Sequence, residues 1–196
     1  SDKAYGTHAS LPYREDTPLQ GQHPYDVSKS CGDLIAHTYA HTYGLPVVVL
    51  RAANLYGGGD LHWNRIVPGT IRSVLQGEQP IIRSDGTMRR DYIFIKDVVS
   101  GCLQVAEAMH RPEVRGQAFN FGIDNPVSVL EMVQTIIRLA GKTAVQPIIL
   151  DEVQNEIQNQ YLCSEKARQV LGWLPIYSLE TGLNETISWY QEFLAL

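Results

Sequence analysis

The chain has 196 residues, of which 44% are hydrophobic and 19% are charged, and its formal net charge is −5. This length allows one substantial core or two small ones, and the composition excludes a disordered or fibrous protein. Because no stretch concentrates Lys and Arg, a nucleic-acid partner is disfavoured. No apolar run approaches the roughly 20 residues that span a bilayer, so we expect no membrane partner.

Cysteine and histidine residues are few and dispersed. Cys31, Cys102 and Cys163 lie far apart, without a C-x-x-C pair, and the six histidines show no metal-ligand spacing. Dispersed cysteines of odd number indicate reduced thiols that pack as small hydrophobic residues. We therefore expect a cytoplasmic protein without a metal site.

The first part of the chain predicts a loop, a helix and a strand. Turn-forming residues dominate positions 1–23, which we interpret as loop. Pro24 suits a first helical turn, and Gly44 followed by Pro46 is a stop signal, so we expect a helix over 24–43. The apolar run 47–50 is typical of a strand that is buried on both faces of a parallel sheet.

Helices and strands alternate through the rest of the chain. Ser128 and Glu131 have capping-box spacing and open one of the expected helices. The expected helices cover 66–75, 97–109, 128–141, 164–171 and 178–194, and the expected strands cover 80–82, 91–95, 117–121 and 146–150. This alternation predicts an α/β fold.

Tyr25 and Lys29, in the sequence Y-D-V-S-K, are the first candidates for chemistry. Four positions apart on a helix, their side chains project from one face. A lysine ammonium beside a tyrosine hydroxyl stabilises the phenolate, which can then take a proton from a substrate hydroxyl. Alone, the pair is a weak signal, because a packed tyrosine beside a solvated lysine is the commoner origin of this spacing.

The order of several motifs gives this pair a context. The chain opens S-D-K-A-Y-G, Tyr25 follows 24 residues after Ser1, and five more segments come in order. They are L-R-A-A-N-L-Y-G-G-G-D (50–60), R-I-V-P (65–68), R-R-D-Y-I-F-I-K-D-V (89–98), F-N-F-G (119–122) and L-G-W-L-P (171–175). Together they resemble the extended short-chain dehydrogenase/reductases, the NAD-dependent epimerases and dehydratases, over essentially the whole chain.

The resemblance implies a fold and a division into two parts. We expect a partial Rossmann-type parallel sheet, its second half, with a small α/β substrate-binding lobe. Residues 1–60 would complete the NAD-binding domain, and residues 61–196 would mainly form the nucleotide-sugar lobe, with some segments returning to the sheet. No G-x-G-x-x-G sequence occurs, although backbone contact with the NAD pyrophosphate needs one. We expect a fragment that is inactive alone.

Asp2 and Lys3 resemble the CDP-glucose 4,6-dehydratases, as does the segment 155–167. In this family Ser1, Tyr25 and Lys29 would oxidise the sugar at C4 with NAD, and Lys29 would also bind the nicotinamide ribose. Asp2 would protonate the hydroxyl that leaves C6, and Lys3, if neutral, would take the C5 proton. A 4-epimerase needs no such acid, so Asp2 discriminates the two reactions. An Asp that only orders the following turn is the alternative.

Four residues are expected to bind the nucleotide-sugar substrate. Asn54 and Gly57-Gly58-Gly59 would lie near its pyrophosphate, by the resemblance. Arg90 is the first phosphate candidate, because a guanidinium matches two phosphate oxygens; a surface arginine is the alternative. Arg65 and Arg83 are further candidates on the nucleotide side.

Three functions follow as hypotheses. The first is an NAD-dependent 4,6-dehydratase acting on a CDP-glucose-like nucleotide sugar. The second is a 4-epimerase on the same scaffold, and the third is a remnant that only binds nucleotide sugar or dimerises. The helix over 24–43 would pack against its twin in a homodimer through Leu34, Ile35 and Tyr39, unless these residues face the core.

Overall fold

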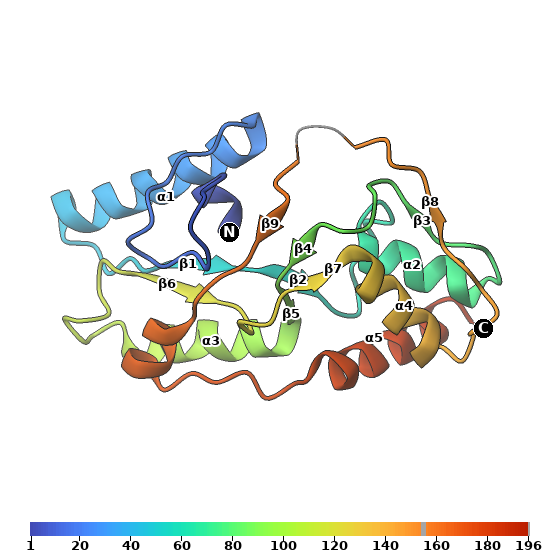
Figure 1. Cartoon of the computed structure of the whole chain (residues 1–196). Helices are drawn as coiled ribbons and strands as arrows, with labels where there is room; N and C mark the ends of the chain where they lie inside the picture. Colours follow the sequence, from blue (N-terminus) through green and yellow to red (C-terminus); the bar gives the residue numbers. More distant parts are fainter. Residues whose placement is uncertain (154–155, 196) are drawn as a thin grey trace.

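Short strands flanked by helices build the chain, which a computed structural model describes over residues 1–153 and 156–195 (Figure 1). The helical segments are η1 (Asp2–Tyr5), α1 (Pro24–Tyr43), α2 (Ile66–Leu75), α3 (Ile95–Ala108), α4 (Val129–Leu139), η2 (Ala167–Leu171) and α5 (Leu179–Phe193). The strands are β1 (Val49–Ala52), β2 (Asn54–Tyr56), β3 (Ile81–Ile82), β4 (Arg89–Arg90), β5 (Tyr92–Phe94), β6 (Ala118–Phe121), β7 (Val127–Ser128), β8 (Ile148–Ile149) and β9 (Asn159–Gln160). The order confirms the expected α/β class.

Parallel strand pairs run through the middle of the molecule. β1 pairs with β6 in the register Arg51↔Asn120, and β2 pairs with β5 in the register Asn54↔Tyr92. In Figure 1, α1 and η1 lie on one side of these strands and α3 on the other. Strand β4 is the centre of a three-stranded sheet, antiparallel to β7 and parallel to β9. The Asn54 amide donates to the carbonyl of Asp91, which follows β4 directly, so the carboxyl end of β1 and the start of β2 lie next to the sheet that contains β9.

Two main hydrophobic clusters support these elements. One packs β6 and α3 against Tyr5 and the loop that follows η2, with Phe119, Phe121 and Trp173 fully buried. The other joins α2, α4 and α5 through the side chains of Ile71, Met132, Ile136, Leu183 and Ile187. The expected division at residues 60 and 61 stays a prediction.

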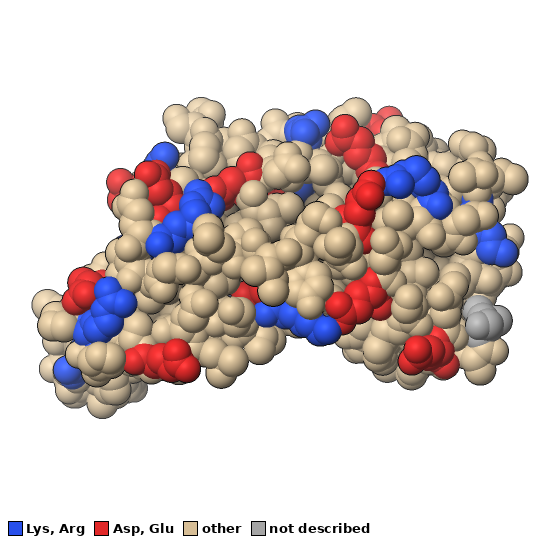
Figure 2. All heavy atoms as spheres, turned by 90° about the horizontal axis from the view of Figure 1, so that it is seen from below, with Lys and Arg blue, Asp and Glu red and all other residues tan. Residues whose placement is uncertain are grey.

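Charge and hydropathy on the surface agree with the composition. On the face that Figure 2 shows, acidic and basic side chains are intermixed between larger uncharged areas. Among the described helices, none is both long enough and apolar enough to cross a bilayer.

Several expected elements are confirmed, and some differ. The helices over 24–43 and 66–75 have the expected bounds, and Gly44 ends α1 in the left-handed region at φ 63°. Ser128 Oγ accepts from the Glu131 amide, and the Glu131 carboxylate accepts from the Ser128 amide, which confirms the capping box.

The expectation of loop over 1–23 is wrong at its start, where η1 forms a 3-10 turn capped by Ser1. The strand expected at 47–50 lies at Val49–Ala52, and three of its four residues are only half-buried because its described partner strand is β6 alone. Residues 54–56 form the unexpected strand β2. Full burial of a strand needs a neighbour on each edge as well as helices on both faces, and sequence alone does not locate the second neighbour.

Gly57 and Gly58 allow close packing of the loop that follows β2. A Cβ on Gly57 would lie 2.4 Å from Ile95 Cγ2, and one on Gly58 would lie 2.4 Å from Trp189 Cγ. Both glycines thus let the loop after β2 approach α3 and α5. The expectation that the glycines at 57–59 lie near a pyrophosphate stays a prediction.

Helix α1 carries an exposed apolar face. Leu34, Ile35 and Tyr39 are each at least half exposed, whereas the buried residues of the helix are Asp26, Ser30 and Asp33. These three apolar side chains therefore do not face the core of this chain. Their contact with a second copy stays a prediction.

Two glycines in helix interiors provide a matched test of the packing. A Cβ on Gly101 in α3 would lie 2.4 Å from the Phe121 ring, whereas one on Gly32 in α1 would meet nothing within 4 Å. We expect Gly101→Ala to lower the free energy of unfolding by about 1–3 kcal/mol through overpacking. Gly32→Ala should raise it by up to about 1 kcal/mol through helix propensity. Urea titration measures both; equal effects would contradict this packing of α3 on β6.

Candidate active site

One cavity of about 980 Å³ brings together the five catalytic candidates and the four substrate-binding candidates, Asn54, Arg65, Arg83 and Arg90. It opens between η1, the start of α1, the end of β1, the start of β2, and α2. Its lining includes Ser1, Asp2, Lys3, Tyr25, Lys29, Asn54, Arg65, Arg83 and Arg90. A volume of several hundred cubic ångströms or more is typical of a small-molecule site.

Helix η1 presents the first three residues to this cavity. Ser1 Oγ accepts from the Lys3 amide at 3.3 Å, and the Ser1 nitrogen donates to the Leu50 carbonyl at 3.2 Å. Ser30 of α1 donates through Oγ to the Ala4 carbonyl at 2.8 Å. The turn is therefore held between β1 and α1.

Asp2 and Lys3 lie in a buried polar environment. Asp2 is 3% exposed, its Oδ2 atom has no hydrogen-bond partner, and burial raises the pKa of its carboxyl to about 6. Lys3 Nζ donates to Gln160 Oε1 at 2.5 Å, and burial lowers the pKa of its amine. The acid is thus easier to keep protonated and the amine easier to keep neutral than in water.

Tyr25 and Lys29 form a second wall of the cavity, on the first turns of α1. Tyr25 is 52% exposed, and Lys29 Nζ lies 5.0 Å from the centroid of its ring. Pro24 at the first helical position and His23 Nδ1, which accepts from the Tyr25 amide at 3.4 Å, begin the helix here. The expected spacing does place both side chains on one face.

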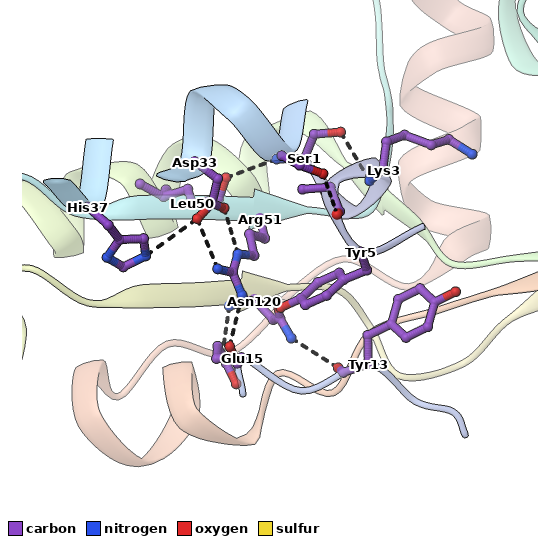
Figure 3. A network of polar contacts seen from close by, with 12 residues as sticks. Ser1, Lys3, Tyr5, Tyr13, Glu15, Asp33, His37, Leu50, Arg51 and Asn120 are labelled. Carbon is purple, nitrogen blue, oxygen red and sulfur yellow. Dashed lines mark hydrogen bonds and ion pairs between the residues drawn. The ribbon is translucent and has the colours of Figure 1, made fainter. Parts of the chain in front are cut away.

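A buried ion pair fixes α1 to β1 (Figure 3). Arg51 donates to both carboxylate oxygens of Asp33, from Nε at 2.7 Å and from Nη2 at 3.0 Å. Both side chains are almost fully buried. Such a two-point contact fixes orientation as well as distance.

The same guanidinium extends to η1 and to β6. Arg51 Nη1 donates to the Tyr5 hydroxyl at 2.9 Å, and that hydroxyl donates to Asn120 Oδ1 at 2.7 Å. Burial raises the pKa of Tyr5 to about 12, so the hydroxyl keeps the proton that it donates. The backbone amide of Asn120 donates to Glu15 Oε1 at 2.8 Å. One network therefore joins both walls of the cavity.

The four nominated substrate-binding residues differ in how many contacts they make within the chain. Arg65 pairs with Asp60 at 2.9 Å, and Arg83 Nη2 donates to Asn64 Oδ1 at 3.4 Å. Both guanidinium groups lie on the α2 side of the cavity. Asn54 is held by its backbone, whose amide donates to the Asp91 carbonyl at 3.0 Å.

Arg90 is buried, so the alternative of a surface arginine is wrong for it. Its Nη1 donates to the Arg89 and Gln158 carbonyls, each at 3.0 Å, and its Nη2 lies 3.5 Å from Glu156 Oε2. Since these contacts occupy most of its donors, any role in phosphate binding stays a prediction.

Sequence reasoning missed the contribution of β9 and its flanks. Gln160 contacts Lys3, Glu156 lies beside Arg90, and both belong to the segment 155–167 that was noted without a role. Asn155 of that segment lies outside the described residues. Asp91, fully buried with its pKa raised to about 7 by burial, was also missed. An acidic residue directly before the apolar run Y-I-F-I was the available signal.

Comparison with known proteins decides the family. The NAD dependent epimerase/dehydratase family matches residues 1–122. The chain belongs to this family. The expected family is confirmed, and the expected match to its CDP-glucose branch stays a prediction.

Its relatives include dehydratases and epimerases. A dTDP-glucose 4,6-dehydratase of Xanthomonas campestris is 29% identical over 97% of the chain and 56% of its own length. The dTDP-glucose 4,6-dehydratase of Bacillus anthracis, solved with NAD, is 31% identical with a TM-score of 0.85, over 98% of this chain and 60% of that one. The UDP-glucose 4-epimerase of Thermotoga maritima, solved with UDP-glucose, is 28% identical with a TM-score of 0.89, over 99% and 62%. The chain thus spans little more than half of these relatives, and their fold confirms the expected Rossmann-type class.

The buried ion pair should be essential to the fold. Arg51→Met leaves the Asp33 carboxylate buried with its main partner removed, and we expect a loss of about 3–5 kcal/mol in the free energy of unfolding. Arg14→Met removes an exposed ion pair with Glu165 and should change the free energy of unfolding far less, because solvent screens such a pair. Chemical denaturation compares the two variants. Similar losses would show that the buried pair does not hold α1.

Asp2 should make the stability depend on pH. The pKa of Asp2 is about 6 in the native state and 3.8 in the unfolded state. Ionisation of Asp2 therefore destabilises the native state as pH rises from about 3.8 to about 6, and this loss of stability persists at higher pH. Asp2→Asn removes that cost, so its stability relative to the parent should improve by up to about 3 kcal/mol between pH 3.5 and 7. Denaturant titrations at several pH values measure this, with the exposed Asp16→Asn controlling for net charge. A difference that stays constant with pH would contradict the burial of Asp2.

Proposed function

We propose that this chain carries the catalytic and substrate-binding residues of an NAD-dependent nucleotide-sugar 4,6-dehydratase. The observation that supports this best is the buried Asp2 carboxyl, which has an unpartnered oxygen beside Lys3 at the cavity that Tyr25 and Lys29 also line. A dehydratase needs an acid for the departing hydroxyl and a base for the adjacent carbon. Two groups whose environments move their pKa values towards neutrality match these roles.

The residues on α1 suit the nicotinamide side of the cofactor. The Lys29 ammonium and the half-exposed Tyr25 hydroxyl offer donors at the open part of the cavity. The chemistry that NAD supplies when bound is hydride acceptance from C4 and hydride return to C6. Tyr25 takes the C4 hydroxyl proton, Lys29 stabilises its phenolate, and Ser1 orients the hydroxyl by hydrogen bonding.

The residues on η1 suit the elimination. A ketone at C4 acidifies C5, and the neutral Lys3 amine takes the C5 proton. The electron pair of the C5–H bond forms the C5–C6 double bond while the C6–O bond breaks. Asp2 gives its proton to the leaving hydroxyl, which departs as water. Lys3 then returns a proton to C5, and Tyr25 and Asp2 regain their starting states by proton exchange with solvent.

The substrate is proposed to be a nucleotide hexose, with CDP-glucose as the first candidate because of Asp2 and Lys3. Arg65 and Arg83 line the cavity on the α2 side and offer positive charge for the pyrophosphate. The dehydratase relatives named above act on a dTDP-sugar, so the base is the part of the proposal that needs a direct test.

We also propose that the chain works within a longer polypeptide. It spans 56% of the dehydratase that it matches and contains no G-x-G-x-x-G sequence for the NAD pyrophosphate. The isolated chain should therefore bind NAD weakly and be inactive. Exposure of Leu34, Ile35 and Tyr39 on α1 supports the further proposal of a homodimer.

A nucleotide-sugar 4-epimerase is the second candidate, supported by the close structural match to the Thermotoga enzyme. An epimerase uses the oxidation at C4 but no leaving hydroxyl. Asp2 would then have no catalytic step to perform. Its substitution separates the two reactions.

The test uses the natural polypeptide that contains this chain, incubated with NAD+ and CDP-, dTDP-, GDP- and UDP-hexoses. We expect one sugar to lose 18 mass units by mass spectrometry, and Asp2→Asn to reduce that dehydration by about 10²-fold or more, the size of a general-acid contribution. Asp16→Asn, on the exposed surface, is the control. An unchanged mass with a new stereoisomer, insensitive to Asp2→Asn, would instead establish the epimerase.

A further inference from the structure

We propose that Gln160 is a positioning residue, which holds Lys3 in place as the base that takes the C5 proton. The inference rests on the proposed dehydratase and assigns a role to β9, which neither the motifs nor the relatives define. Gln160 Oε1 accepts from Lys3 Nζ at 2.5 Å, across 157 positions of sequence. This contact joins β9 to η1.

The backbone fixes where the Gln160 side chain points. Strand β9 pairs with β4 in the register Arg90↔Gln160, and the Asp91 amide donates to the Gln160 carbonyl at 3.3 Å. Successive side chains of a strand point to opposite faces, and here Asn159 is exposed while Gln160 is fully buried. Gln160 therefore contacts Lys3 from a rigid element and not from a loop.

A neutral acceptor is the appropriate partner for a lysine that must lose its proton. Burial lowers the pKa of Lys3, and the Arg90 charge acts in the same direction, whereas Asp2, Asp26 and Glu156 raise it. An amide oxygen accepts from either form of the amine without adding a further negative charge. A carboxylate at position 160 would instead favour the ammonium form.

The unpartnered atoms nearby indicate that the arrangement is completed by something outside the chain. Gln160 Nε2 and Asp2 Oδ2 are both buried without a hydrogen-bond partner. A buried donor and a buried acceptor of this kind are normally satisfied by ordered water or by a ligand. Since the amide oxygen already accepts from Lys3, the Nε2 donor of Gln160 is available to a buried water beside it.

The charge test needs no turnover. We expect Gln160→Glu, which keeps shape and an acceptor oxygen, to raise the pKa of Lys3 by about one unit or more. NMR of lysine labelled at Cε, with Lys3 assigned from a Lys3→Met variant, follows the titration in the natural polypeptide. Asn159→Asp adds the same charge on the opposite face of β9 and should leave the titration of Lys3 unchanged. Equal shifts in both variants, or none in either, would overturn the proposal.

The kinetic test separates this role from a purely structural one. In the natural polypeptide we expect Gln160→Glu to move the acidic limb of the pH profile of kcat upward by about one unit, with KM nearly unchanged. Gln160→Met, of similar volume but without an acceptor, should lower kcat about tenfold or more without this shift. Circular dichroism confirms that both variants fold.

Failure of this proposal differs from failure of the dehydratase. If the parent releases no water from any nucleotide sugar, the proposed function fails, while the NMR titration still tests the contact of Gln160 with Lys3. If the parent dehydrates its substrate and both Gln160 variants keep its pH profile and kcat, Gln160 has no positioning role.

Discussion

The contact between Arg51 and Asp33 is the constraint on which the site depends. It joins α1 to β1, and through Tyr5 and Asn120 the same guanidinium reaches η1 and β6. A buried guanidinium is costly unless its donors are satisfied, so its bonds select one arrangement of these four elements. Tyr25 and Lys29 on one wall, and Asp2 and Lys3 on the other, are therefore held in a common frame.

Burial then sets the chemistry that this frame can perform. Asp2 is removed from water and lacks a partner for one oxygen, which favours its protonated form, and Lys3 is buried in contact with an amide oxygen, which permits its neutral form. An uncharged acid and an uncharged base can thus coexist near neutral pH at adjacent positions. The α1 wall stays more open, since Tyr25 is about half exposed. The η1 wall suits proton transfer, and the more open α1 wall suits a larger, polar group.

Local signals accounted for much of the fold. Pro24 and Gly44 delimit α1, and Ser128 with Glu131 caps α4, because these residues act on backbone groups within one turn of themselves. The strands were less accurate: β1 lies two residues later than expected, and β2, β4, β7 and β9 were not foreseen as separate strands. Strands of two or three residues depend on their partners, and partner choice is not a local property.

By itself the sequence determined the family, the alternation of helix and strand, and nine of the residues that line the cavity. Its ordered motifs contain side chains with specific chemical groups, and the order and spacing of those motifs are what resemble the family. Only the tertiary structure decided which groups are buried and which contacts they make: Arg90 is engaged by backbone carbonyls, and Gln160 reaches Lys3. The physical reason is that burial and long-range hydrogen bonding arise between segments far apart in the chain. A side chain's neighbours, and hence its acidity, are therefore properties of the fold and not of the local sequence.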